Sequence, residues 1–270
     1  MFQDIAPHIF NNHYEPLPPT EGDFAVCVKN GKILANSVNG VLSLPVLTSS
    51  VIPACGPYLF TIDSSRFFYV EDIPVSGSFS LFSYRELSVL SPSWLAFGAM
   101  TGLRLATWYQ ENRYCGKCGQ KLKHSSAERM VYCENCGMTI YPRINPAVIV
   151  AVRNGEKLLL TKYARGYSHY ALVAGFTESG ETIEETVCRE VFEETGVHVK
   201  NITYFSSQPW PHSGSLLFGF YCDLDGSDAI TIQESELSVA EWIDRSELPA
   251  QGSTMSLTST LIEAFRKHII

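Results

Sequence analysis

Residues 175–197 constrain this chain more than any other stretch, because a glycine-rich loop there runs into a short acidic segment. Thr182 can cap the N-terminus of a helix, and Glu185 three residues later completes a capping box. Gly196 supplies the left-handed residue that ends many helices. Between these ends, apolar residues recur every four positions at Ile183, Val187 and Val191. The pattern predicts a short helix with one apolar stripe.

Three carboxylates, those of Glu190, Glu193 and Glu194, fall beside and partly over the apolar stripe. On a solvated helix they would lie opposite it, so we expect all three to lean towards the interior. Like charges packed together oppose ionisation unless a cation neutralises them. Oxygen ligands of this kind suit Mg²⁺ or Mn²⁺, and Arg189 can hold Glu193 or Glu194 in place. The alternative is a surface helix that is merely rich in glutamate.

This stretch resembles the signature of the Nudix hydrolases at all of its defining positions, which are Gly175, Glu181, Arg189, Glu190, Val191, Glu193, Glu194, Gly196 and Val197. The resemblance implies an α/β/α sandwich. It also implies a divalent-metal-dependent attack of water on a diphosphate that is linked to another group. The signature alone does not identify that group.

Two Cys-x-x-Cys pairs, Cys115 with Cys118 and Cys133 with Cys136, precede the acidic segment. At this spacing four thiolates can close a tetrahedral site, for which Zn²⁺ is the usual ion. We expect the nearby glycines, Gly116, Gly119 and Gly137, to allow the tight turns. Because four thiolates leave no open position for water, the zinc should be structural. Two disulfides are the alternative interpretation.

The remaining cysteines, Cys27, Cys55, Cys188 and Cys222, are scattered among apolar residues, and we expect them to be buried free thiols. Free thiols indicate a reducing, cytoplasmic compartment. No run approaches the ~20 apolar residues of a membrane helix, so no membrane span is expected. The formal net charge of −8 disfavours non-specific binding to nucleic acid.

The order of patterns predicts three domains within an α/β (α+β) chain. Residues 1–110 carry short β-rich runs and then a helix over 91–112, which we expect to be interrupted at Gly102. Residues 111–142 hold the cysteine pairs of the zinc ribbon. Residues 143–270 hold the Nudix sandwich, with a strand and Asn-Gly hairpin near 147–161 and a last helix over 256–268.

Residues 207–211 read Ser-Gln-Pro-Trp-Pro, and two prolines around Trp210 predict a rigid turn that presents an aromatic face. A core tryptophan in a loop is the alternative. Together with the cysteine pairs and the Tyr141-Pro-Arg run, this stretch is similar to the NADH pyrophosphatase family of Nudix enzymes, over residues from about 85 to 265. That family continues the stretch with Phe-Pro-x-Ser, whereas this chain has His212, Ser213 and Gly214 before the matching Ser215.

The resemblance implies the roles of individual residues. Glu190, Glu194 and Glu236 would hold the catalytic metals together with the Ala174 carbonyl. Glu193 would be a further metal-site carboxylate, and Glu190, Glu193 and Glu194 would be the catalytic residues. Phe176 and Trp210 would stack on the rings of the substrate, with Trp210 supplied by the partner in a homodimer. The other substrate-binding residues would be Arg85, Glu128, Tyr141, Gln208, Pro209, Pro211, His212, Ser213, Gly214 and Ser215.

The implied reaction is hydrolysis of NAD(H) to NMN(H) and AMP, and NAD caps at RNA 5′ ends offer the same bond in a longer substrate. Two alternatives stay open. One is a Nudix hydrolase that acts on ADP-ribose or a dinucleoside polyphosphate. The other is a non-catalytic regulator that binds nucleic acid through the zinc ribbon.

Overall fold

The computed structural model describes residues 1–15, 17–74, 77–166, 169–251 and 255–270. The chain divides into two compact units, Phe2–Arg143 and Ile144–Ile270, the second also including Met1. The three-domain division with boundaries after 110 and 142 stays a prediction. Among the described residues, no helix is both long and apolar enough to cross a membrane.

The first unit begins with two small β-sheets. One has the order β1-β6-β7-β2, and the other has the order β3-β4-β5 with β8 paired to β4. The strands are β1 (Phe10–Asn11), β2 (Phe24–Val26), β3 (Val28–Lys29), β4 (Lys32–Val38), β5 (Val41–Ser43), β6 (Cys55–Ile62), β7 (Ser65–Val70) and β8 (Ser80–Phe82), with the 3-10 turn η1 (Ile52–Ala54) before β6. The predicted β-rich start of the chain is confirmed.

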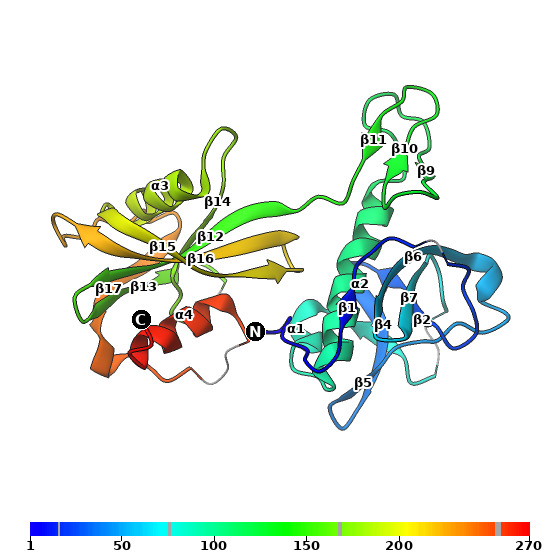
Figure 1. Ribbon diagram of the computed structural model, residues 1–270, viewed down its shortest axis with the longest axis horizontal. Coiled ribbons are helices and arrows are strands. Elements are labelled where there is room, and N and C mark those ends of the chain that lie inside the picture. The colour runs from blue at the N-terminus through cyan, green and yellow to red at the C-terminus, as the bar shows by residue number, and fades with distance from the viewer. Residues whose placement is uncertain (16, 75–76, 167–168, 252–254) are drawn as a thin grey trace. The chain divides into compact units, whose positions relative to one another are not determined.

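Two helices follow, α1 (Tyr84–Leu87) and α2 (Ser93–Glu111), and α2 runs beside the strands of this unit (Figure 1). The predicted interruption at Gly102 is wrong, because α2 is continuous through this residue. A Cβ atom at Gly102 would lie 2.9 Å from Cγ2 of Val26 in β2. The glycine therefore permits close approach of helix and sheet and does not break the helix.

The zinc ribbon closes the first unit with a small sheet of order β11-β10-β9. Its strands are β9 (Lys123–His124), β10 (Val131–Tyr132) and β11 (Thr139–Ile140). The second unit is built on a six-stranded sheet of order β15-β16-β12-β13-β17, with β14 paired to β12. These strands are β12 (Asn145–Asn154), β13 (Lys157–Tyr163), β14 (Val173–Phe176), β15 (His198–Trp210), β16 (Ser215–Asp225) and β17 (Leu237–Asp244).

Two helices cover opposite faces of the six-stranded sheet (Figure 1). On one face, α3 (Ile183–Thr195) packs Val187 and Val191 onto Val148 and Val150 of β12. On the other face, α4 (Leu257–Arg266), which follows the short turn η2 (Arg245–Glu247), packs onto the alternate residues of the same strand. Because successive side chains of a strand point to opposite faces, the continuous apolar run of β12 serves both layers. The predicted α/β/α sandwich is confirmed.

The packing of α2 on β2 leads to a prediction about stability. We expect Gly102→Ala to lower the free energy of unfolding by about 1 kcal/mol, because overpacking costs about 1–3 kcal/mol and the gain in helix propensity is about 1 kcal/mol. Urea denaturation measures the difference. In a Val26→Ala background the same change should be neutral or stabilising, since the clashing methyl groups are gone. A loss that persists in that background would contradict this account.

Candidate active site and metal centre

The acidic helix α3 has the ends that the sequence predicts. The Thr182 side chain accepts a hydrogen bond from the Glu185 amide at 3.2 Å, and the Glu185 carboxylate accepts one from the Thr182 amide at 2.7 Å. Gly196 ends the helix with a φ of 71°. The capping box and the left-handed stop are therefore confirmed, and they fix where each acidic side chain points.

Two of the three predicted carboxylates turn inward. Glu190 is 9% exposed and Glu194 is 2% exposed, whereas the Glu193 side chain is 52% exposed. The prediction that all three lean towards the interior is wrong for Glu193. This residue lies six positions after Val187, which places it about 120° around the helix from the apolar stripe. Glu190 and Glu194 lie within about 60° of the stripe.

Gly175 on β14 makes room for the first inward carboxylate. A Cβ atom at this position would lie 1.8 Å from Cδ of Glu190. No other residue leaves this space without moving helix or strand. Gly175 pairs with Val148 of β12, so the Glu190 carboxylate lies directly over the sheet on the α3 face.

Arg189 ties the loop, the helix and β14 together. Its guanidinium donates to Glu181 at 2.5 and 2.9 Å, to Glu190 at 2.8 Å and to Glu193 at 3.0 Å. It also donates to the Phe176 carbonyl oxygen at 2.9 Å. The predicted contact with Glu193 is confirmed, and the structure adds Glu181 and Glu190. Arg189 is the main reason that the pKa of Glu181 is lowered to about 2.

Among the acidic residues of α3, Glu194 is the one in the least favourable environment for a negative charge. Burial, followed by the charges of Glu190 and Glu236, raises its pKa to about 8. Its Oε2 atom is buried and has no hydrogen-bond partner among the described residues. Burial is also the largest cause of the raised pKa of Glu190. A bound cation would relieve both the desolvation and the repulsion, so these residues fit a divalent metal.

A cavity of about 640 Å³ opens beside these carboxylates. It is lined by Ala174, Gly175, Phe176, Glu178, Arg189, Glu190, Glu193, Gln233 and Glu236. The structure thus brings Glu236 and Ala174 to the acidic helix from distant parts of the sequence. Sequence analysis missed Gln233, whose amide lies 3.5 Å from the Glu236 carboxylate. The only hint in the sequence that Gln233 lies at the cavity is its position three residues before Glu236.

The acidic residues do not form a tight cage. Within the part of the chain that the structure describes, the four cysteines are the one group of three or more candidate ligands whose atoms all lie within 4.8 Å of one another. Mg²⁺ usually keeps several water ligands and needs only one or two carboxylates. The wider spacing of Glu190, Glu194 and Glu236 is compatible with that kind of site.

The stretch 207–211 is not the predicted turn. Residues up to Trp210 belong to β15, and Trp210 pairs with Ser215 of β16. Pro209 is tolerated because β15 is an edge strand. On the side of β15 that has no neighbouring strand, the missing amide of a proline costs no hydrogen bond of the sheet. The turn lies at 211–214, where His212 and Ser213 are exposed, and Ser213 Oγ lies 2.7 Å from Ser215 Oγ.

Gln208 and Trp210 differ in exposure. Gln208 is fully buried, and Trp210 is half-buried. Neither residue lines the acidic cavity, whereas Phe176 does. Their assignment to substrate binding stays a prediction.

The predicted substrate residues Arg85, Glu128 and Tyr141 belong to the first unit. Arg85 is exposed on α1. The Tyr141 hydroxyl donates to the Glu128 carboxylate at 2.6 Å, and this contact raises the pKa of Tyr141. Glu128 and Tyr141 are therefore brought together, and their role in substrate binding stays a prediction.

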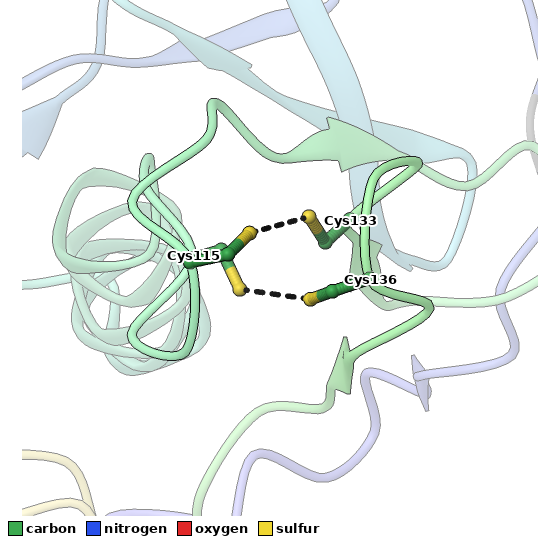
Figure 2. A group of neighbouring side chains, drawn as sticks. Cys115, Cys133 and Cys136 are labelled. Atoms are coloured by element: carbon green, nitrogen blue, oxygen red, sulfur yellow. Dashed lines mark hydrogen bonds between the residues drawn. The ribbon is translucent and has the colours of Figure 1, made fainter.

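The four ribbon cysteines converge on one point. Cys115 Sγ lies 3.5 Å from Cys136 Sγ, and Cys118 Sγ lies 3.4 Å from Cys133 Sγ (Figure 2). In a tetrahedral site with Zn–S bonds of about 2.3 Å, neighbouring sulfurs stand about 3.8 Å apart. The donor set and its spacing fit a structural Zn²⁺ ion, and no disulfide forms among the eight cysteines.

Both cysteine pairs have the same pattern of backbone hydrogen bonds. The Gly119 amide donates to the Cys115 carbonyl, and the Gly137 amide donates to the Cys133 carbonyl. Gly119 and Gly137 have φ values of 75° and 72°, as a tight left-handed turn requires. The same role predicted for Gly116 is wrong, since its φ is not positive.

Two of the other four cysteines are not buried as predicted. Cys27 and Cys222 are buried, but Cys55 is half-buried and Cys188 is exposed on α3. Cys188 follows Val187 by one residue and is therefore about 100° away from the apolar stripe. Apolar neighbours in the sequence do not ensure burial in a helix.

The strained carboxylate predicts a pH dependence in protein without added Mg²⁺ or Mn²⁺. Folded Glu194 keeps its proton up to a pKa of about 8, whereas the unfolded chain loses it near 4.5. The free energy of unfolding should therefore fall as the pH rises from 4.5 to 8, by up to about 1.4 kcal/mol per unit. Urea midpoints across this range test it. Glu194→Gln should flatten that slope, and equal slopes in both proteins would contradict the assignment.

The zinc centre predicts a composition and a stability effect. We expect about one zinc ion per chain in protein purified without chelator. Cys115→Ser should remove this ion and destabilise the ribbon, because structural zinc contributes directly to folding. Atomic absorption and thermal unfolding measure the two effects. The matched variant Cys188→Ser, at an exposed thiol, should keep the ion. A wild-type protein without zinc and with an intact ribbon would refute the site.

Comparison with known proteins identifies two domains. The model of the NUDIX domain matches residues 143–261, and the model of the NADH pyrophosphatase zinc ribbon domain matches residues 110–141. A solved structure described as a NUDIX hydrolase from Nitrosomonas europaea is 22% identical with a TM-score of 0.49, and the match covers 58% of this chain and 91% of that one.

Curated relatives match the same region. The chain is 42% identical over 168 residues to the NAD-capped RNA hydrolase NudC of Haemophilus influenzae strain PittGG, covering 60% of this chain and 63% of the relative. It is 39% identical over 163 residues to the protein of that name in Pseudomonas fluorescens strain Pf0-1, covering 60% and 59%. These matches thus span less than two thirds of the relatives' length. Residues 143–261 belong to the Nudix domain family, and residues 110–141 belong to the NADH pyrophosphatase zinc ribbons.

Proposed function

We propose that this protein hydrolyses the diphosphate bond of NAD(H) to give NMN(H) and AMP, with Mg²⁺ or Mn²⁺ as the catalytic ion. The observation that carries the proposal is the buried pair Glu190 and Glu194 beside a cavity that also holds Glu236. Without a bound cation Glu194 keeps its proton at neutral pH, so a cation is needed for this carboxyl group to ionise there. The names of the relatives, which are NAD-capped RNA hydrolases, support the nature of the substrate.

The residues divide the work of the reaction. Glu190, Glu194 and Glu236, with the Ala174 carbonyl, would hold the metal. When bound, the metal neutralises the diphosphate and makes water a better nucleophile. Glu193, half exposed at the cavity and hydrogen-bonded to Arg189, takes the proton from the attacking water. The water oxygen bonds to one phosphorus while the bridging P–O bond breaks, and the second nucleotide leaves with its phosphate.

Recognition of the substrate rings falls to Phe176 and Trp210. Phe176 is half exposed at the cavity, and stacking on a flat ring is worth about 1–3 kcal/mol. The turn after Trp210, with the exposed His212 and Ser213 and the buried Gly214, completes the contacts to the substrate beside Pro209, Pro211 and Ser215. Arg85, Glu128 and Tyr141 are further substrate-binding residues in this proposal.

We propose that the protein is a homodimer, and the register of the sheet supports this proposal. Phe176 pairs with Ala147 and Ala147 pairs with Leu217, which in turn pairs with Gln208, two residues before Trp210. Three strand spacings, about 14 Å, therefore separate β14 from β15. A second copy of the chain that supplies Trp210 would let both rings enclose one substrate ring.

NAD caps on RNA are a second proposed substrate, because they present the same diphosphate. With a net charge of −8, the chain would hold a polyanion through the metal and through local cations. We further propose that the protein works in the cytoplasm, where its eight free thiols would persist.

One kinetic experiment tests the function. The wild type should convert NADH to NMNH and AMP with Mg²⁺ or Mn²⁺, and Glu194→Gln should lower kcat by about a hundredfold or more, on the scale of losing a key charged group. The control Glu184→Gln alters an exposed acid on the same helix and should keep full activity. Initial rates on NADH, NAD⁺, NAD-capped RNA, ADP-ribose and a dinucleoside polyphosphate rank the substrates. Near-normal NADH hydrolysis by Glu194→Gln would refute the mechanism.

A further inference from the structure

Gln208 holds a fully buried position on β15, two residues before Trp210. It pairs with Leu217 of β16, and both face the layer of α4. A buried amide must satisfy its donor and its acceptor within the protein. The partners of Gln208 therefore indicate what this side chain does.

The two ends of the Gln208 amide bind the backbone at the start of α4. Nε2 donates to the Met255 carbonyl oxygen at 2.9 Å, and Oε1 accepts from the Leu257 amide at 2.7 Å. Leu257 is the first residue of α4, where the helix cannot satisfy its own amide. Ser256, between these two partners, caps the Ser259 amide at 3.1 Å. Gln208 and Ser256 thus complete the helix N-terminus together.

Trp210 is on the same face of β15 as Gln208, because side chains two positions apart on a strand share a face. Between them, Pro209 has a fixed φ and no amide. After them, Trp210 pairs with Ser215. The backbone of Trp210 is therefore held by strand pairing on one side and by the attachment of Gln208 to α4 on the other.

We propose that Gln208 is a positioning residue for Trp210, which it serves by locking the end of β15 to the first turn of α4, and that it does not contact the substrate. This inference rests on the proposed function, in which Trp210 stacks on a ring of the substrate. In this proposal the Trp210 ring recognises the substrate, and the buried Gln208 side chain holds that ring in place.

The test is a double-mutant cycle with NADH as the substrate. Trp210→Ala alone should raise KM about ten- to a hundredfold. Gln208→Met keeps the length of the side chain and removes both hydrogen bonds, and it should raise KM about tenfold with kcat within about twofold. In the Trp210→Ala background, Gln208→Met should change KM by less than about twofold, because the ring it positions is absent.

A matched control and a milder variant accompany the cycle. Gln251→Met removes a glutamine whose amide donates to the nearby Pro249 carbonyl, and it should leave KM unchanged. Gln208→Asn keeps the amide group but is one methylene shorter, so it should reach only one of the two backbone partners. Its effect on KM should be smaller than that of Gln208→Met, and it carries the test if the methionine variant does not fold.

Hydrogen exchange at the Leu257 amide gives a readout that does not need activity. Exchange should be faster in Gln208→Met than in the wild type and unchanged in Gln251→Met. A tenfold rise in KM that persists without Trp210 would overturn the proposal, since Gln208 would then contact the substrate itself. Unchanged protection of Leu257 would also overturn it. A wild type that does not hydrolyse NADH refutes the proposed function instead, and the exchange experiment then decides on the Gln208 attachment alone.

Discussion

The second unit depends on holding the carboxyl groups of two glutamates in its interior. Glu190 and Glu194 are almost fully buried on α3, and they lie close enough to raise the pKa of Glu194. Such burial is unfavourable by itself. It is sustained by features that bind the helix in place, namely the valine stripe, the capped ends and the contacts of Arg189 with β14. Apolar packing thus offsets the unfavourable burial of these carboxyl groups, and a bound cation would lower that cost.

Local signals made the acidic helix predictable. Its caps, its apolar period and its glycine stop all lie within residues 182–196, so the sequence contains the information without reference to the rest of the fold. The orientation of Glu193 was misjudged because the stripe is narrow, and 120° is enough to reach solvent. The two cysteine knuckles were equally local, since each is closed by its own glycine.

Features that depend on how the strands and helices pack together were not predictable. Two prolines around Trp210 favour a turn locally, but β16 supplies a strand partner, and the edge position removes the penalty for Pro209. Gly102 is typical of a break in a helix, yet the surface it meets is β2, about 75 residues earlier in the chain. For Gly102 a neighbour remote in sequence decides the local conformation, whereas Trp210 pairs with Ser215 only five residues later and the position of the strand at the sheet edge is what the sequence does not show. Like Gly102, Gln233 meets residues remote in sequence, those that line the cavity.

The buried carboxylates and the Gln208 side chain lie on opposite faces of the sheet. The carboxylates lie on the α3 face beside Gly175, whereas the row that contains Gln208 faces α4. Phe176, the residue after Gly175 on β14, lines the same cavity as the carboxylates. The departures from the NADH pyrophosphatase pattern, His212 and Ser213, fall in the exposed turn outside the paired residues. They can therefore alter contacts to the substrate while the strand register and the acidic cavity stay as they are.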